Sequence, residues 1–419
     1  MISLLRRRLL APVFAFIAVL GPAIITANVD NDAPGIATYS VAGARYGYGM
    51  LWLLGPTMIV LIVVQEICAR MGIATAKGLA DLIREQFGVK VTLLLMAALL
   101  VTNLANTAGE FAGLAGGAEI LGLSRYLAVP LGALAIFLLV VRGSYSSVER
   151  VFLFACLVYL AYPISGFLAH PPWPHVMAQS FTPSLPLNIA ALTMAVGIVG
   201  TTIAPWMQFY LQATVVEKGT RAAQYALARW DVILGGVFAI VVVFFIVVAC
   251  ATTLHPKVQI EDAAQAAAAL APLAGRYAST LFAIGLLNAA LFAACILPLS
   301  TSYTICEGIG WERGLDRSFR AAPQFYLLYT AMIVLGAAIV LLPGAPLLKI
   351  MLISQVMNGL LLPAILVVML LLATRKSLMG ELVMSRGYTI FCWGLCVLLL
   401  LLDVFLVSVT AAGLVHARS

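Results

Sequence analysis

The sequence predicts an all-α integral membrane protein in a single polytopic domain, residues 1–419, and three observations support this prediction. Of the 419 residues, 63% are hydrophobic and only 10% are charged, whereas soluble domains are about 45–50% apolar and about 25% charged. Apolar segments long enough to cross a bilayer recur along the chain. Two of these segments are interrupted at mid-depth by polar residues and proline. We therefore take lipid, rather than water, as the solvent of this fold.

Eleven segments approach the ~20 mostly apolar residues that a membrane-spanning helix needs. The predicted spans are 11–45 (interrupted), 49–68, 91–120, 126–141, 150–169, 187–215 (interrupted), 231–253, 273–306, 324–343, 346–373 and 388–414. Helices 1–5, within 11–169, would form one repeat, and helices 6–10, within 187–373, a second. Helix 11, at 388–414, would follow them.

The distribution of Lys and Arg predicts the orientation in the membrane. Most of the 24 Lys and Arg residues fall in segments that face the cytoplasm if the N-terminus is inside, which the positive-inside rule favours. Eleven crossings then place the C-terminus outside. This asymmetry also accounts for the net charge of +7 without a nucleic-acid partner. We expect a monomer in the cell (inner) membrane, with the first helix retained rather than cleaved as a signal peptide.

The two interrupted spans have matching positions in the two predicted repeats. The first contains the polar run 28–32 followed by Pro34 and Gly35, and the sixth contains Gly200, Thr201, Thr202 and Pro205. They lie five spans apart, and because five is odd, the two five-helix units would have opposite orientations. Paired broken helices of this kind are typical of inverted-repeat transporters, which bind substrate near the bilayer midplane. Non-helical backbone at that depth is tolerated only where it is buried in protein or lines a cavity.

Asp32 is the strongest candidate ligand for a cation. A carboxylate near the bilayer centre costs several kcal/mol, so an intramembrane acid is a functional hypothesis by default. Asp30 and Asn31 are weaker candidates, because at least one of three adjacent polar residues should face elsewhere. The alternative is that these side chains lie at the outer interface or cap the half-helix that begins near Pro34.

In the sixth span the break carries no charged side chain. Its residues include Thr201, Ala204, Trp206 and Gln208. An unwound segment offers backbone carbonyls, which are hard oxygen ligands suited to magnesium, calcium and manganese. The alternative is a simple helix kink at Pro205.

Two further polar pairs lie inside predicted spans. Gln355 and Asn358 are three residues apart and share a helix face, as do Asn103 and Asn106, with Glu110 one turn further along. Either pair could line a site or simply join helices by hydrogen bonds. The sequence leaves open whether Glu110 belongs to a proton path.

Four stretches of the chain carry a family resemblance. They are Gly21–Pro22 with Asp32 and Ala42–Tyr48, then Gln65–Gly72 with Lys77–Leu82, then Gly200–Leu211, and finally Ser354–Val356 with Leu362–Pro363. In this order they resemble the Nramp family, proton-coupled transporters of divalent transition metals. The resemblance implies a LeuT-type inverted repeat of five plus five helices with an eleventh helix, and with helices 1 and 6 unwound. It also implies that the carbonyl groups of Val29 and Thr201 and the side chain of Gln355 line the ion site.

The chain departs from the family pattern at the expected ligands. The family motif Asp-Pro-Gly-Asn aligns with Asp32–Gly35, so that Gly35 replaces the asparagine ligand. The motif Met-Pro-His aligns with Ala204–Trp206, so that Ala204 replaces a soft thioether and Trp206 replaces a histidine. The span-3 acids associated with proton movement align with Asn103 and Asn106.

These departures resemble the Nramp-related magnesium transporters. Without the thioether, a reason to prefer transition metals is lost, and the smaller side chains leave room for the waters that magnesium keeps. We therefore expect a passive or weakly coupled secondary transporter, not an enzyme, that carries Mg²⁺ first and Mn²⁺ second as substrates, without proton coupling and without a cofactor. Asp30, Asn31 and Gln208 would hold the waters of the ion.

Three alternatives remain at this stage. The first is a proton-coupled Nramp-type transporter of manganese or another transition metal. The second is a LeuT-fold amino-acid or amine transporter, in which Asp32 is a counter-ion and Trp206 a cation–π platform. The third is a sensor or scaffold that does not transport. Within the metal reading, a trivalent ion with hard oxygen ligands is also possible.

Overall fold

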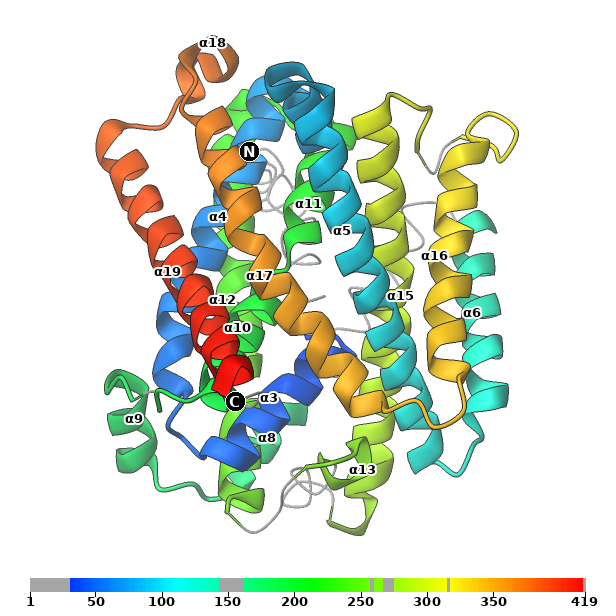
Figure 1. Cartoon of the computed structure of the whole chain (residues 1–419), viewed down its shortest axis with the longest axis vertical. Coiled ribbons are helices and arrows are strands. Elements are labelled where there is room, and N and C mark those ends of the chain that lie inside the picture. The colour runs from blue at the N-terminus through cyan, green and yellow to red at the C-terminus, as the bar shows by residue number, and fades with distance from the viewer. Residues whose placement is uncertain are drawn as a thin grey trace, which may run out of the picture.

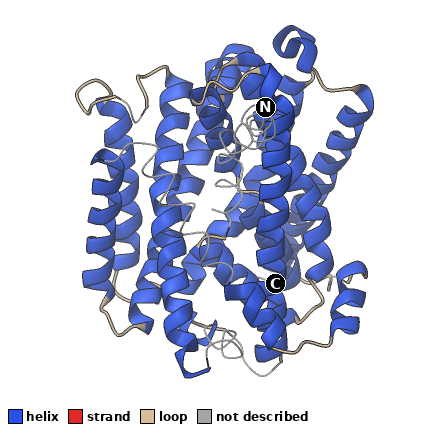
Figure 2. Cartoon of the chain, turned by 180° about the vertical axis from the view of Figure 1, so that it is seen from behind, coloured by secondary structure: helices blue, strands red, loops and turns tan. Residues whose placement is uncertain are grey.

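The computed structural model describes residues 31–142, 161–184, 186–256, 260–266, 275–314 and 317–416. Over these residues the fold is all-helical, without a strand (Figure 2). The first half of the first predicted span, with Val29 and Asp30, lies outside the described residues. So does the first part of the fifth predicted span.

The predicted spans that fall within the described residues are helical. The helices are α3 (Ala33–Tyr46), α4 (Leu54–Thr75), α5 (Leu79–Ile120), α6 (Arg125–Arg142), α8 (Ala161–Leu168), α9 (Trp173–Phe181), α10 (Ile189–Thr202), α11 (Pro205–Glu217), α12 (Tyr225–Leu254), α13 (Ala263–Ala266), α15 (Ala278–Ile309), α16 (Pro323–Leu341), α17 (Leu347–Ala373), α18 (Lys376–Met379) and α19 (Arg386–His416). In this part of the chain, eight helical stretches are long and apolar enough to cross a membrane, counting α10 and α11 as one.

The long helix α5 lies within the bundle, packed against α15 and α17 (Figure 1). The half-helix α3 packs against α12, α17 and α5, and α10 packs against α17 and α3. Helices α6 and α16 pair at one side of the bundle, and α19 lies at the other side beside α17. Both half-helices that border the predicted breaks therefore meet α17.

The sixth span is interrupted as predicted. Helix α10 ends at Thr202 and α11 begins at Pro205, while Ile203 between them has φ −132° and ψ 60°, outside the helical region. Pro205 has no backbone N–H, so the carbonyl group of Thr201, four residues earlier, lacks its helical donor. The structure thus contains a true break, and the simple kink considered from the sequence is wrong.

Two helices are longer than their predicted spans because polar segments continue them. Helix α4 runs on to Thr75 rather than ending near residue 68, and α5 begins at Leu79 rather than near residue 91. Within α5, Gly88 has φ 80° and ψ 173°, a conformation that glycine adopts without a steric penalty. A short polar helix, 79–87, is thereby set apart from the membrane-spanning part of α5.

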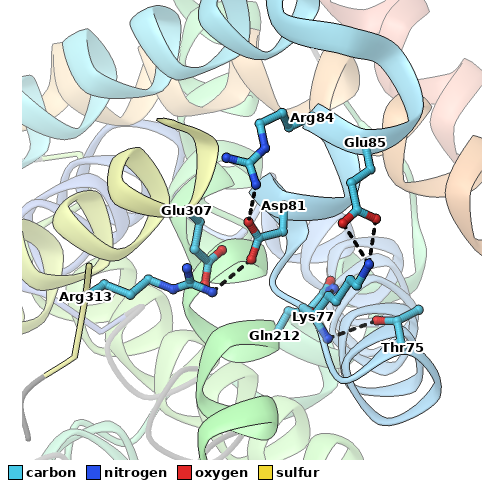
Figure 3. A network of polar contacts seen from close by, with 8 residues as sticks. All are labelled: Thr75, Lys77, Asp81, Arg84, Glu85, Gln212, Glu307 and Arg313. Carbon is cyan, nitrogen blue, oxygen red and sulfur yellow. Dashed lines mark hydrogen bonds and ion pairs between the residues drawn. The ribbon is translucent and has the colours of Figure 1, made fainter. Parts of the chain in front are cut away.

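Ion pairs hold the polar segment of α5 against the end of α15 (Figure 3). The carboxylate of Asp81 accepts from Arg84 at 3.4 Å and from Arg313 at 2.8 Å. Arg313 also pairs with the buried Glu307 at 3.2 Å. We call this end of the bundle the basic end; it is the end that the positive charges predict to face the cytoplasm.

Helix α11 joins the same end. The side-chain amide of Gln212 donates to the backbone carbonyl of Lys77 at 2.9 Å, and the hydroxyl of Tyr303 donates to Glu217 at 3.2 Å. A cavity of about 510 Å³ lies between α11, α15 and the start of α5. Helix α11 therefore connects the break in the sixth span to the basic end.

A second buried ion pair joins α4, α12 and α19. Glu66 accepts from Arg70 at 2.8 Å, from the hydroxyl of Tyr388 at 2.9 Å, and from the hydroxyl of Tyr225. The guanidinium group of Arg70 lies 5.2 Å from the ring centre of Tyr225 and 5.5 Å from that of Tyr388. A buried carboxylate with this many donors is well compensated, and the contacts anchor the start of the last helix.

Candidate metal-ion site

Asp32 lies at the start of α3 and caps it. Its Oδ1 accepts from the backbone N–H of Gly35 at 2.6 Å, and Pro34 occupies the first turn, where a missing N–H costs nothing. The side chain is only 5% exposed. The sequence left open whether Asp32 is a cap or an ion ligand. The structure confirms the cap, which uses one of the two carboxylate oxygens.

Glu110 of α5 lies directly against Asp32, which the sequence did not predict. The two carboxyl groups are close enough to interact electrostatically. Glu110 Oε2 also accepts from the backbone N–H of Ala33 at 3.3 Å, while Oε1 is buried without a partner. The N-terminus of a helix favours negative charge, so the start of α3 is a suitable place for both acids.

Glycines on α5 make this close approach possible. A Cβ atom added at Gly113 would overlap Ala33, and one added at Gly109 would lie 2.8 Å from Pro34 Cγ. Small residues of this kind allow membrane helices to approach closely. The flanking glycines were the signal in the sequence that could have identified Glu110.

Asn31 in the first span and Thr201 in the sixth each carry buried polar side-chain atoms without a protein partner. Both the Oδ1 and the Nδ2 of Asn31 are unpaired, and so is the hydroxyl of Thr201. Next to Thr201, the hydroxyl of Thr202 bonds to that of Tyr39 at 2.8 Å, which ties α10 to α3. Because buried polar groups almost always have a partner, these atoms mark a place where water or a ligand would bind.

Gln355 of α17 bonds within a cluster of amides. Its Nε2 donates to Ser354 Oγ at 3.2 Å and to Asn106 Oδ1 at 3.4 Å, and its Oε1 accepts from Asn358 at 3.0 Å. Its backbone carbonyl lies against α10, where a Cβ atom at Gly200 would overlap it. The predicted pairs on α5 and α17 are therefore brought together by Asn106.

The remaining predicted residues take other positions. The amide of Gln208 folds back onto its own helix, where its nitrogen donates to the carbonyl groups of Pro205 and Ala204. Ala204 caps α11 in an extended conformation. The ring of Trp206 is buried, with its centre 6.2 Å from that of Tyr210. The structure thus does not direct the Gln208 amide to Asp32.

Asn103, predicted at a former proton-path position, joins two helices. Its Nδ2 donates to the hydroxyl of Thr301 on α15 at 2.8 Å. Gly35 contributes its backbone N–H to the Asp32 cap. Val29 and Asp30, the other two predicted ligands, lie outside the described residues.

The donor set of the site consists of oxygen atoms. Two carboxyl groups, from Asp32 and Glu110, lie at the start of α3, which follows Asn31 with its unpaired Oδ1, and the break in the sixth span leaves the carbonyl group of Thr201 without a helical donor. Among the residues that the structure describes, no group of three or more His, Cys, Asp or Glu side chains gathers in one place. Hard oxygen donors of this kind favour Mg²⁺, Ca²⁺ and Mn²⁺ over softer metals.

The sequence matches one family model over most of its length. That model, described as natural resistance-associated macrophage protein-like (Nramp), matches residues 23–409. The match includes both predicted breaks and every residue of the candidate site.

Solved structures share the fold at low sequence identity. A mutant of the Eremococcus coleocola manganese transporter has a TM-score of 0.77 at 20% identity, with 95% of this chain and 88% of that chain covered. The same transporter with an aromatic bis-isothiourea substituted compound has a TM-score of 0.75 at 21% identity, covering 94% and 87%. A nucleobase-cation-symport-1 family transporter in a closed conformation has a TM-score of 0.59 at 15% identity, covering 95% and 91%. These likenesses confirm the predicted LeuT-type fold.

Proposed function

Because the chain belongs to the natural resistance-associated macrophage protein-like family, we propose that it carries a divalent metal ion across the membrane. The observation that carries this proposal is that two acids are buried together at the start of α3, where Asp32 caps the helix and Glu110 accepts from the N–H of the next residue, Ala33. Each carboxylate alone would be costly inside a bilayer. A divalent cation bound between them would neutralise both.

Mg²⁺ is the first proposed ion and Mn²⁺ the second. Magnesium dehydrates reluctantly and is usually held by one or two carboxylates together with several waters. Gly35 and Ala204, where the family pattern has ligands, offer no side-chain donor and leave space for water. The unpaired atoms of Asn31 and the unpaired hydroxyl of Thr201 would bind these waters. The manganese transporters of the same fold support Mn²⁺ as the competing ion.

Entry would be driven by the membrane potential. One elementary charge gains about 2.3 kcal/mol per 100 mV, so a divalent ion gains about twice that. Transport would proceed by a rocking motion of one group of helices against another, which would expose the acids to one side of the membrane at a time. The hydrogen bond between Tyr39 and Thr202 joins the half-helices α3 and α10. With the basic end in the cytoplasm, the N-terminus is inside and the C-terminus outside in our proposal, in the cell (inner) membrane as a monomer.

One observation favours a second candidate function, proton-coupled transport of manganese or another transition metal. The expectation of transport without proton coupling depended on Asn103, Asn106 and Trp206, because their side chains do not bind and release protons as acids or a histidine would. The structure nevertheless places a titratable group, Glu110, in contact with Asp32. Two carboxylates buried beside one another repel each other unless a proton or a cation lies between them, so an arriving cation would displace a proton.

Uptake into proteoliposomes tests both candidates. A magnesium-sensitive dye and, separately, a pH-sensitive dye inside the vesicles would compare the wild type with Asp32→Ala, with Mn²⁺ as the competitor. Asp403→Ala, which removes another acid within an apolar helix, α19, is the matched control. Saturable Mg²⁺ entry that Mn²⁺ inhibits, that Asp32→Ala abolishes and that Asp403→Ala retains would support the proposal.

The proton readout separates the two candidates. Internal acidification that tracks metal entry would favour the coupled function and overturn the uncoupled one. Mn²⁺ entry without Mg²⁺ entry would overturn the magnesium assignment. If the wild type transports neither ion, or if Asp32→Ala transports as well as the wild type, the proposed site is wrong.

A further inference from the structure

Two asparagines form a reciprocal pair between α5 and α17. Asn106 Nδ2 donates to Asn358 Oδ1 at 2.7 Å, and Asn358 Nδ2 donates to Asn106 Oδ1 at 3.0 Å. Both side chains are fully buried. An amide has an oxygen that only accepts and a nitrogen that only donates, so two bonds in opposite directions fix the orientation of each group relative to the other.

This pair also orients Gln355. The second hydrogen of Asn358 Nδ2 is donated to Gln355 Oε1 at 3.0 Å, and Gln355 Nε2 donates to Asn106 Oδ1 at 3.4 Å. We call Asn106, Gln355 and Asn358 the amide triad. If the Gln355 amide were reversed, its nitrogen would face the donor of Asn358 and its oxygen the acceptor of Asn106. Ser354 sets the direction of the whole triad, because its hydroxyl donates to the carbonyl group of Met351 at 2.8 Å and accepts from Gln355 Nε2 at 3.2 Å. The triad and Ser354 together therefore select one of the two orientations of Gln355.

Orientation matters for a residue beside a cation site. The carbonyl oxygen of an amide binds a cation or donors from its waters, whereas the NH₂ group repels the cation. Gln355 Oε1 has two lone pairs, and Asn358 uses one of them. The second lone pair stays available only while the amide keeps its orientation.

The triad is packed against the proposed ion site. Asn106 precedes Glu110 by one turn of α5. Between them, at Gly109, an added Cβ atom would lie 3.0 Å from Ser354 Oγ and 2.8 Å from Pro34 Cγ. Helices α3, α5 and α17 thus meet at Gly109, which is adjacent to Glu110 and about one turn from Asn106.

We propose that Asn358 and Asn106 are positioning residues that hold the carbonyl oxygen of Gln355 ready for the transported ion or its waters. This inference rests on the proposed function, since it needs an ion bound near Asp32. The competing explanation is that the triad only joins two helices. The chain supplies a control for that explanation, because Asn103 of α5 bonds to Thr301 of α15 at 2.8 Å outside the triad.

The first measurement is the KM and the kcat of Mg²⁺ uptake, with Mn²⁺ in parallel. Asn358→Ala is expected to raise KM about 10-fold, the loss typical when a partner that orients a metal ligand is removed, with kcat changed less than about 2-fold. Asn103→Ala should leave KM near the wild-type value. Asn106→Ala removes the other orienting partner and repeats the test if Asn358→Ala does not fold.

The second measurement uses Gln355→Glu, because both atoms at the tip of a carboxylate are oxygens and its orientation does not matter. In this background Asn358→Ala should no longer raise KM. A purely structural role would instead raise KM, or lower the amount of folded protein, equally in both backgrounds. That result, or an Asn358→Ala variant indistinguishable from Asn103→Ala, would overturn the inference. If the wild type transported neither ion, or if Asp32→Ala did not impair uptake, the proposed function itself would fail.

Discussion

Glu110 reaches the start of α3 from the C-terminal half of α5, where its Oε2 accepts at 3.3 Å from the N–H of Ala33, the residue after Asp32. Glu110→Gln keeps the shape and the bond from Ala33 but removes one charge. We expect the KM for Mg²⁺ to rise about 30-fold or more, because removing one partner of a buried charge pair costs roughly 2–5 kcal/mol. Concentration-dependent uptake into proteoliposomes measures this.

The control for Glu110 lies on the same helix. Glu119 is more exposed and pairs with Arg125 at 2.6 Å. Glu119→Gln should change KM less than about 2-fold, as expected for a surface ion pair. Equal KM values for Glu110→Gln and the wild type would exclude Glu110 as part of the ion site.

The hydroxyl of Thr201 is buried without a partner, whereas that of Thr202 bonds to Tyr39 at 2.8 Å. Thr201→Val should therefore leave the ion-free protein at least as stable as the wild type, while Thr202→Val should cost about 1 kcal/mol. Mg²⁺ should raise the melting temperature of Thr201→Val by less than it raises that of the wild type, because the hydroxyl that would bind the waters of the ion is gone. Thermal unfolding in detergent, with and without Mg²⁺, measures both effects. An unchanged response to Mg²⁺ in Thr201→Val would contradict this role.

Gly200 and Gly197 offer a matched pair on α10. A Cβ atom at Gly200 would overlap the backbone of Gln355 and Gly359, whereas one at Gly197 would make ordinary contacts of 3.7 and 3.8 Å. Gly200→Ala should separate α10 from α17, at a cost typical of overpacking, about 1–3 kcal/mol, and should abolish uptake. Gly197→Ala should fold and transport normally. Folded yield by size exclusion and uptake by vesicles are the readouts, and a fully active Gly200→Ala would show that the helix contact is not needed.

Arg70 should contribute much more to stability than Lys77, although both form ion pairs. Arg70 lies between two tyrosine rings and compensates the charge of the buried Glu66. Arg70→Ala removes this partner, which should lower the free energy of unfolding by about 3–5 kcal/mol. Lys77 and Glu85 form an exposed pair at 2.7 Å, worth about 1 kcal/mol or less. Melting temperatures of the two Ala variants compare these costs. Similar values would show that the Glu66 cluster does not anchor α19.

Much of the fold could be predicted from the sequence, because apolar length, Pro205 and the spacing of the two breaks are local signals. The helix ends were harder. Residues 79–87 are polar, and their helix is held in place by contacts such as that of Asp81 with Arg313, a partner far along the chain. No periodicity within 79–90 shows that contact.

The candidate site was predicted in part. Asp32 stood out because an acid inside an apolar span is rare. The position of Glu110 at the start of α3 was not predicted, because it depends on how closely α3 approaches Gly109 and Gly113. Gln208 was assigned to the site from its place near the break, but its amide folds onto its own helix, a local choice that helix spacing does not reveal.

Helix α11 starts at the break in the sixth span and holds the backbone of Lys77 through Gln212. Lys77 and Glu85 are exposed at the surface of the basic end. Any tilt of α11 during transport therefore pulls on a segment that reagents can reach without entering the membrane. A spectroscopic label at residue 85 turns this tether into a reporter, so that opening of the buried site is read as a signal from the water phase.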